Sequence, residues 1–215
     1  MAMSAGKILI VGCGPGSPEY LTEAARRAVG RANVLVGSRR LLELFADAAA
    51  ERIVAGSDTA ALVAEIDRRR AAGCRVAVLV SGDPGFYSLA QPVTARFGRA
   101  ECEIVPGISS VQVAFARLGL DWIDARLLSA HGRTPEIAAE ELRGCDKIAI
   151  LAGSAAALGW SAQAADALRE THAAVLCENL TLDGERVAPV TPEELARSGA
   201  GSLAIVLLVR RSQLA

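Results

Sequence analysis

The residues best suited to hold a ligand form a turn, Gly-Cys-Gly-Pro-Gly at residues 12–16, which directly follows the apolar run at residues 7–11. Glycines at the end of a buried strand let a ligand approach the backbone closely, because no Cβ is in the way. A dinucleotide-binding turn needs a third glycine where Ser17 stands, and a carboxylate where Gly-Ser-Arg-Arg occupies residues 37–40. Both departures argue against a nicotinamide cofactor. A strand-to-helix connection that binds no ligand is the alternative.

Two further turns follow apolar runs in the same way. Ser-Gly-Asp-Pro-Gly-Phe-Tyr-Ser at residues 81–88 follows the run at 75–80, and Pro-Gly-Ile-Ser-Ser at 106–110 follows the run at 102–105. In open parallel sheets, ligands bind outside the carboxyl ends of the strands. Taken singly, the first sequence is also a plain turn signal, and the serines of the second also suit a helix cap. Three such strand ends in order are more specific than any one of them.

The pattern of apolar runs predicts the elements that position these turns. Strands and Ala/Arg/Glu-rich helices alternate through the first half, which predicts a mainly parallel α/β sheet. The expected strands there are 8–11, 33–36, 75–80 and 102–105, and the expected helices are 21–30, 39–48, 59–72, 88–97 and 110–118.

The second half has fewer helices and closer strands, which predicts a mixed sheet. Its expected strands are 125–129, 147–151, 174–177, 185–187 and 203–210, and its expected helices are 161–170 and 192–198. We therefore expect an N-terminal α/β domain at residues 1–118 and a C-terminal α/β domain at 119–215. A cleft between two such domains is the default ligand site.

Composition excludes several classes of function. Of the 215 residues, 52% are hydrophobic but only 4% are aromatic, and the net charge is −1, which disfavours a nucleic-acid surface. No apolar run approaches the ~20 residues that span a bilayer, and we expect no contact with a membrane. The five cysteines form no Cys-x-x-Cys pair and are odd in number, which favours a reducing compartment and a cytoplasmic protein. No spacing of His, Cys and Asp indicates a metal site.

The three turns resemble a known set of motifs. Residues 12–22, 81–88 and 106–110 resemble the three N-terminal motifs of the tetrapyrrole (corrin/porphyrin) methylases, the S-adenosyl-L-methionine (SAM) methyltransferases of cobalamin and sirohaem synthesis. The sequences at residues 129–133, 177–181 and 185–187 are similar to those of the subgroup that methylates C5 of precorrin-7 or cobalt-precorrin-7. The resemblance covers nearly the whole chain.

This resemblance implies a two-domain tetrapyrrole methylase fold and a homodimer. SAM would lie in the interdomain cleft, leaving S-adenosyl-L-homocysteine as product, and the tetrapyrrole would lie over the N-terminal domain. No metal is implied. The positions that would contact SAM are Pro15, Ser81, Gly82, Asp83, Phe86, Ser109, Ser110, Ala152 and Val190. Relatives often have methionine in place of Ala152, and often glycine in place of Val190.

Other residues are candidates for the substrate. Gly12 and Gly14 would give room to the flat macrocycle. Arginine suits the carboxylates of a precorrin through its planar, two-pronged donors, which makes Arg39, Arg40 and Arg133 candidates, although each also suits a plain surface position. His131 is the candidate general base, with a structural loop histidine as the alternative. We expect His172 to be structural.

The leading hypothesis is a SAM-dependent C5-methyltransferase of cobalamin biosynthesis. One alternative keeps the fold with another substrate, such as uroporphyrinogen III, a different precorrin, a diphthamide precursor or rRNA. Another is a non-catalytic protein that binds corrinoid intermediates. Some members of the subgroup are fused to a methyltransferase and decarboxylase that acts at C15. Because this chain ends at Ala215, that partner is expected to be a separate protein. The sequence leaves open whether the substrate contains cobalt.

Overall fold

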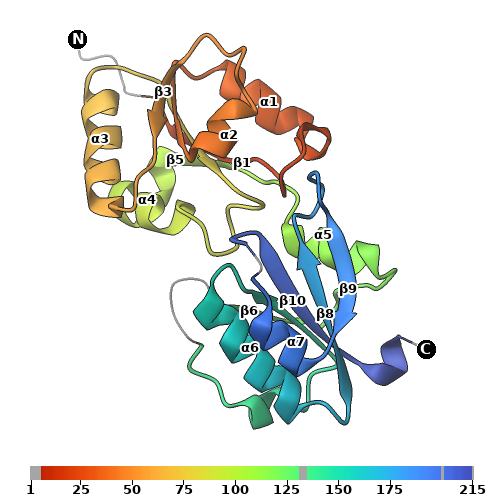
Figure 1. Ribbon diagram of the computed structural model, residues 1–215. Helices are drawn as coiled ribbons and strands as arrows, with labels where there is room; N and C mark the ends of the chain where they lie inside the picture. The colour runs from red at the N-terminus through yellow and green to blue at the C-terminus, as the bar shows by residue number, and fades with distance from the viewer. Residues whose placement is uncertain (1–5, 131–134, 200, 215) are drawn as a thin grey trace. The chain divides into compact units, whose positions relative to one another are not determined.

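The computed structural model describes residues 6–130, 135–199 and 201–214. The chain forms two compact units, Met1–Ser109 and Ser110–Ala215, which follow one another along the colour bar of Figure 1. The sequence predicted this boundary at residue 118. It falls earlier because helix α5 (Ser110–Arg117) packs against strand β10 (Ala204–Arg210) of the second unit.

The first unit is built on a five-stranded sheet with the strand order β3-β2-β4-β1-β5, in which every neighbouring pair is parallel. The predicted parallel character is confirmed, whereas the strand order was not predicted. Strand β1 lies between β4 and β5, so the turns that follow these three strands leave the same edge of the sheet side by side. The strands are β1 (Ile8–Gly12), β2 (Val34–Gly37), β3 (Glu51–Val54), β4 (Val76–Val80) and β5 (Cys102–Val105).

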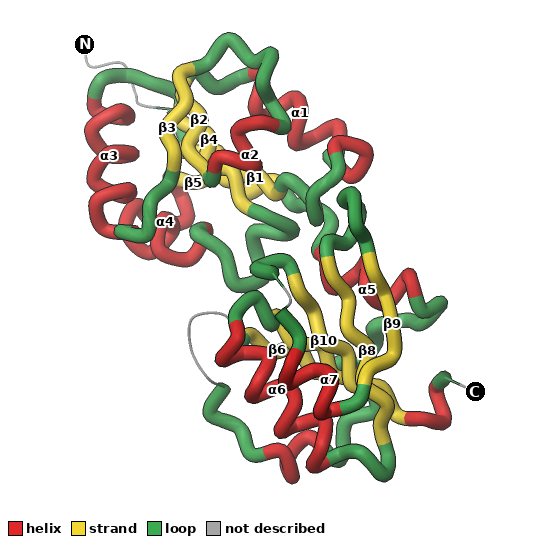
Figure 2. Tube along the Cα trace, viewed as in Figure 1, coloured by secondary structure: helices red, strands yellow, loops and turns green. Residues whose placement is uncertain are grey.

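Helices cover both faces of this sheet, as Figures 1 and 2 show. Alternate residues of β1 point to opposite faces, so Leu9 and Val11 join one core cluster and Ile8 and Ile10 join the other. The first cluster includes residues of α1 (Glu23–Gly30) and α2 (Arg39–Glu43), and the second includes residues of α3 (Thr59–Ala71) and α4 (Ala90–Phe97). The short 3₁₀ helices are η1 (Pro18–Tyr20) and η2 (Arg99–Glu101).

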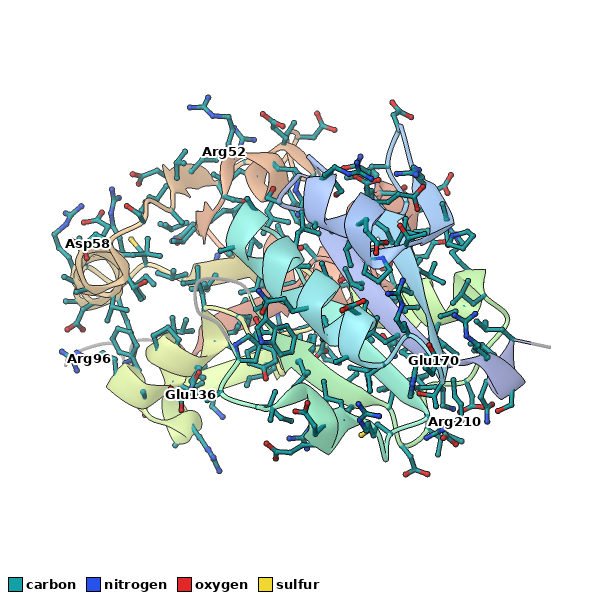
Figure 3. All side chains as sticks on the ribbon, turned by 60° about the horizontal axis from the view of Figure 1, so that its bottom comes forward. Arg52, Asp58, Arg96, Glu136, Glu170 and Arg210 are labelled. Atoms are coloured by element: carbon teal, nitrogen blue, oxygen red, sulfur yellow. The ribbon has the colours of Figure 1, made fainter. Side chains whose placement is uncertain are left out.

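Side-chain contacts fix the ends of these helices. Asp58, labelled in Figure 3, caps α3 by accepting a hydrogen bond from the backbone N–H of Ala61 at 3.0 Å. Arg96, labelled in the same figure, joins α4 to α3 through Asp67 at 2.7 Å. The predicted cap at Asp58 and the predicted end of α3 before Gly73 are confirmed, since Gly73 has φ +81°.

Two elements of the first unit differ from the sequence prediction. Helix α2 ends at Glu43 instead of residue 48, because Arg52, labelled in Figure 3, binds the carbonyl oxygens of Phe45 and Ala48 at 3.2 and 3.3 Å. Strand β3 was not predicted. Its Glu-Arg-Ile-Val sequence is mostly exposed, and it forms by adding its backbone to β2 at the edge of the sheet.

The second unit contains the mixed sheet that the sequence predicted, with the order β6-β7-β10-β8-β9. Among the described strands of this second sheet, only β6 and β7 pair in parallel. The pairs β7–β10, β10–β8 and β8–β9 are antiparallel. Its other strands are β6 (Arg126–Ser129), β7 (Lys147–Leu151), β8 (His172–Glu178) and β9 (Arg186–Val190).

Helices α6 (Ala155–Ala167) and α7 (Pro192–Arg197) share one core cluster with this sheet, and α5 packs against β10 with residues outside that cluster. Helix α6 starts earlier than the predicted residue 161, because the Ser154 hydroxyl caps it by accepting the N–H of Ala157 at 3.2 Å. The remaining 3₁₀ helices are η3 (Ala139–Leu142) and η4 (Arg211–Gln213). Within the described residues, no helix has both the length and the apolar character needed to cross a bilayer.

Candidate functional site

The first two turns are joined by backbone hydrogen bonds at the carboxyl edge of the first sheet. The N–H of Cys13 donates to the carbonyl of Val80 at 2.9 Å, which extends the pairing of β1 with β4 beyond the strands. Gly14 and Gly82 then exchange two bonds, 3.3 Å from Gly14 to Gly82 and 2.8 Å in return. Both glycines have positive φ, +73° and +66°, which other L-residues rarely adopt. Backbone hydrogen bonds therefore hold the first and second turns together.

The third turn is tied to the second by the Asp83 carboxylate. Its Oδ2 accepts the N–H of Gly107 at 3.1 Å, and its Oδ1 accepts the N–H of Gly85 at 2.8 Å. Hydrogen bonds to an ionised carboxylate are stronger than those between neutral groups. Asp83 therefore joins two of the three turns, whatever else it binds.

Glycine is required where the turns meet. A Cβ on Gly12 would lie 2.6 Å from the backbone N of Gly107 and 2.8 Å from the carbonyl oxygen of Gly82, and a Cβ on Gly14 would lie 2.9 Å from the carbonyl oxygen of Tyr20. The expectation that Gly12 and Gly14 give room to the flat macrocycle stays a prediction, because the Cβ positions describe only one side of each residue. The space that their missing side chains leave is filled by protein backbone.

The first turn lacks the geometry of a phosphate-binding loop. Ser17 caps the short helix η1 by accepting the N–H of Glu19 at 3.2 Å, and α1 begins only at Glu23. No α-helix N-terminus therefore follows the glycines directly, as a dinucleotide fold requires. Pro15 is buried.

The second turn carries two aromatic side chains. Phe86 is half-buried, and its ring meets that of Tyr87 edge to face with centroids 4.9 Å apart. Tyr87 is 55% exposed and has φ +46°, a strained conformation for a residue with a side chain. Strain of this kind concentrates at ligand sites. Ser88 holds the start of α4, accepting the N–H of Ala90 at 3.1 Å.

A cation lies beside the same turn. Arg40 donates from Nη2 to the Oγ of the exposed Ser81 at 3.1 Å, while its Nη1 is buried without a hydrogen-bond partner. Burial lowers the pKa of Arg40 from its ordinary value. The neighbouring Cys13 thiol has its pKa raised by burial to about 12, so it remains protonated at neutral pH. Arg39 is exposed.

The structure brings most of the predicted contacts of the first unit together. Gly12, Gly14, Ser81, Gly82 and Asp83 are linked directly through these turns. Ser109 and Ser110 follow the third turn and are half-buried, with Ser110 opening α5. The outward groups of this edge are a hydroxyl, a guanidinium and an aromatic ring, and such a set suits a flat ligand that bears carboxylates.

In the second unit, Ala152 follows β7 and is fully buried. Its N–H donates to the carbonyl of Ala204 at 3.0 Å, and its own carbonyl accepts the N–H of Ser154 at 2.9 Å. The sequence placed a backbone contact to SAM here. Since the N–H is already used, only the second lone pair of the Ala152 carbonyl remains for such a contact.

Val190 lies at the other end of this sheet. Val190 pairs with Ala174, near the start of β8. Ala152 instead bonds to Ala204, and Ala204 pairs with Glu178 at the end of β8. The structure therefore does not bring Val190 and Ala152 together. Val190 instead lines a separate hollow of about 650 Å³, together with residues of β8, α7 and η4.

His172 is structural, as the sequence predicted. It is buried, its Nε2 lies 2.8 Å from the carbonyl oxygen of Cys145, and its Nδ1 lies 2.8 Å from the Thr171 hydroxyl. Nε2 therefore carries the proton, since a carbonyl only accepts. The other histidine, His131, and Arg133 lie outside the described residues.

The β8–β9 hairpin contains a cluster that sequence reasoning missed. The Glu185 carboxylate binds Arg117 of α5 at 2.5 and 3.1 Å and accepts the N–H of Thr181 at 2.6 Å. These hydrogen bonds, with Arg117 the larger cause, lower the pKa of Glu185. Asn179 and Thr181 have positive φ, +50° and +67°. The residues that resemble the subgroup motif therefore shape this turn. Their closeness in the sequence, at residues 177–181 and 185–187, was the one signal that could have indicated these contacts.

No group of three or more His, Cys, Asp or Glu side chains in the described part of the chain is arranged to hold a metal ion. All five cysteines are free, and Cys13, Cys102 and Cys177 are buried.

Comparisons with known proteins agree with this architecture. The family described as tetrapyrrole (corrin/porphyrin) methylases matches residues 7–196. Cobalt-precorrin-7 C(5)-methyltransferase of Salmonella typhimurium is 35% identical over 181 residues, which cover 84% of this chain and 88% of the relative.

Two solved structures share the fold. The cobalamin biosynthesis precorrin-6Y methylase of Archaeoglobus fulgidus aligns with a TM-score of 0.72 at 32% identity, over 95% of this chain and 98% of that one. Uroporphyrin-III C-methyl transferase of Thermus thermophilus, complexed with S-adenyl homocysteine, aligns with a TM-score of 0.74 at 23% identity, over 95% and 92%. At that identity the second likeness shows the fold alone.

Proposed function

Because the chain belongs to the tetrapyrrole (corrin/porphyrin) methylases, we propose that it transfers a methyl group from SAM to C5 of a precorrin in cobalamin biosynthesis. The observation that carries this proposal is the 35% identity with a cobalt-precorrin-7 C(5)-methyltransferase along most of both chains. The relative named for uroporphyrin is less similar, at 23%. Precorrin-7 and cobalt-precorrin-7 are therefore the first substrates to test.

The methyl donor supplies a reactive sulfonium when it is bound. The task left to the protein is to orient the two reactants, and well-oriented reactants gain several kcal/mol of the barrier. The three turns suit this task, because Gly14, Gly82, Asp83 and Gly107 bind one another and hold the edge rigid. Membership of the methylase family supports the choice of donor.

We assign the donor to the second and third turns and to the end of β7. The proposed contacts are Pro15, Ser81, Gly82, Asp83, Phe86, Ser109, Ser110 and the carbonyl of Ala152. Val190 has the least support, since the register of β8 places it at the opposite end of the second sheet from Ala152.

For the substrate, the proposal keeps Arg40 and Arg133 for the carboxylates and His131 for proton removal. Arg39 is exposed, and we assign it to the alternative given by the sequence, a plain surface position. His172 is not available as a base, because both of its ring nitrogens are bonded inside the second unit. The exposed ring of Tyr87 offers an aromatic face beside the same turn.

The proposal also includes a homodimer in the cytoplasm, without nucleic acid or membrane, and a separate enzyme for the reaction at C15. Free cysteines support the cytoplasm, and a net charge of −1 with few aromatic residues supports the absence of nucleic acid. A dimer is tested by light scattering of the purified full chain, where a monomer mass would contradict it.

Calorimetric titration with SAM tests the class of function. An enzyme of this kind binds SAM, whereas a carrier of corrinoid intermediates does not. Incubation with SAM and a panel of cobalt-precorrin-7, precorrin-7 and uroporphyrinogen III, followed by product mass, then tests the substrate. We expect one added methyl on a precorrin-7. If the protein binds SAM but methylates only uroporphyrinogen III, the proposed substrate is wrong and the assignment as a SAM-dependent methyltransferase stands.

A further inference from the structure

Arg40 occupies a defined place at the carboxyl edge of the first sheet. It lies in α2, directly after β2, and β2 pairs with β4. Its Nη2 donates to Ser81 Oγ, the first residue after β4, at 3.1 Å, and this contact is exposed. The guanidinium is therefore held against the second turn, with one of its nitrogens at the surface.

Among the residues that the structure describes, none of opposite charge compensates Arg40. No carboxylate of the described residues pairs with it, and its buried Nη1 has no hydrogen-bond partner. Other half-buried arginines differ in this respect: Arg69 pairs with Glu51 and Glu65, and Arg210 pairs with Asp146. An unmade hydrogen bond on a buried nitrogen costs free energy, and the charge of Arg40 is available to an anionic ligand.

We propose that Arg40 is the carboxylate-binding residue of this site, with the Ser81 hydroxyl orienting its guanidinium. The Nη2 atom at the surface can donate its second N–H to one carboxylate oxygen, and the Ser81 hydroxyl, which accepts from Nη2, can donate to the other oxygen. The inference rests on the proposed function, because both proposed ligands carry carboxylates. These are the amino-acid carboxylate of SAM and the acetate and propionate groups of the tetrapyrrole.

The neighbouring arginine provides a matched control. Arg39 has the same charge and lies one residue earlier in α2, but it is exposed, whereas Arg40 is half-buried. A general attraction of anions to this surface would depend on both residues. A specific carboxylate site depends on Arg40 and on the shape of its guanidinium.

The experiment compares Arg40→Gln, Arg40→Lys and Arg39→Gln with the unaltered full chain. Calorimetry measures the affinity for SAM and for decarboxylated SAM, and absorbance titration measures the affinity for cobalt-precorrin-7. We expect Arg40→Gln to weaken one carboxylate ligand about ten-fold or more. Arg40→Lys keeps the positive charge but not the planar guanidinium, and it should lose less affinity than Arg40→Gln. Arg39→Gln should remain within about two-fold, since exposed ion pairs contribute little.

The ligands distinguish the two sources of carboxylate. If Arg40 binds SAM, Arg40→Gln lowers the affinity for SAM and leaves that for decarboxylated SAM unchanged. If it binds the tetrapyrrole, only the affinity for cobalt-precorrin-7 falls. Thermal unfolding gives an independent readout, because removing an uncompensated cation should leave the melting temperature equal or higher, whereas loss of a structural contact lowers it.

Two results would overturn the assignment of Arg40. They are unchanged affinity of Arg40→Gln for every ligand, whatever its melting temperature, and an equal loss of affinity in Arg39→Gln. Failure of the proposed function is separate. An unaltered protein that binds SAM or the tetrapyrrole but does not methylate cobalt-precorrin-7 overturns the function and still tests Arg40 by binding. A protein that binds none of these ligands overturns both.

Discussion

At the scale of single residues, Asp83 shows how a predicted ligand contact also has a structural role. The sequence placed it against SAM on the strength of a motif, and the structure shows its carboxylate bound to Gly85 and Gly107. The sequence located the residue but not these partners, because Gly107 lies 24 residues away and meets Asp83 only when β4, β1 and β5 are assembled.

Replacement of Asp83 by Ala should therefore affect stability as well as binding. Two backbone N–H groups lose a charged acceptor, and we expect the free energy of unfolding to fall by about 2 kcal/mol, with weaker binding of SAM. Urea unfolding and calorimetry measure the two effects. Asp83→Asn keeps one acceptor oxygen, so its stability should lie between that of the unaltered protein and that of Asp83→Ala. An Ala variant with the stability and SAM affinity of the unaltered protein would contradict both roles.

Residue types alone could not separate Arg40 from Arg39 or assign His131. The two arginines are adjacent in sequence, and only the path of α2 makes one half-buried and the other exposed. Glycine roles were likewise ambiguous. A glycine at a strand end suits close approach of a ligand or of another chain segment, and at Gly12 the segment is residue 107.

At the scale of elements, apolar runs were sufficient to predict the buried strands, including β1, β4 and β5 that carry the turns. Elements set by tertiary contacts were missed. Strand β3 has no apolar pattern, and α2 stops early because Arg52 of β3 binds the carbonyls beyond it. The predicted boundary at residue 118 treated α5 as one more helix of the first sheet, whereas it packs against β10.

The contact between turns gives a sharp test at this scale. A Cβ on Gly107 would overlap with the carbonyl oxygen of Gly82 and with the backbone of Gly12, so Gly107→Ala must displace the turns. We expect a loss of at least about 2 kcal/mol in the free energy of unfolding, with reduced SAM binding. Chemical unfolding of the full chain provides the measurement.

Gly30→Ala is the control for Gly107. Gly30 is the last residue of α1, and a Cβ there would meet nothing within 4 Å. It should leave stability unchanged or raise it by up to about 1 kcal/mol, because alanine favours the helix. Equal effects of the two substitutions would show that the turns do not depend on close backbone packing.

The hairpin of the second unit predicts a dependence on pH. Arg117 lowers the pKa of Glu185, so this ion pair stabilises the fold fully above the ordinary pKa of glutamate, about 4.3, and loses that effect as the pH falls through the lowered value. The stability difference between the unaltered protein and Glu185→Gln should be about 1 kcal/mol at neutral pH and shrink below about pH 4.

Urea titrations across that range measure the difference. Glu178→Gln serves as the comparison, because the partner of Glu178, Arg186, is more exposed than Arg117. A difference that stays constant down to pH 3 would show that Glu185 does not act through its charge.

At the scale of the whole molecule, membership of the tetrapyrrole methylases agrees with both sheets and with the order of the three turns. The proposed substrate depends on similarity along most of the chain and not on any single residue. The motifs at residues 177–181 and 185–187, which resemble the subgroup that methylates C5, form a hairpin whose described contacts include Arg117 and strand β9 of the second unit. Chemistry at C5 therefore needs a direct test.

The most direct test follows the transferred methyl group itself. The full chain is incubated with cobalt-precorrin-7 and SAM that carries a ¹³C-labelled methyl group, and the product is analysed by NMR. We predict one labelled methyl group on the tetrapyrrole, bonded to C5. A label on a different ring carbon, or SAM binding without any transfer to cobalt-precorrin-7 or precorrin-7, would contradict the account.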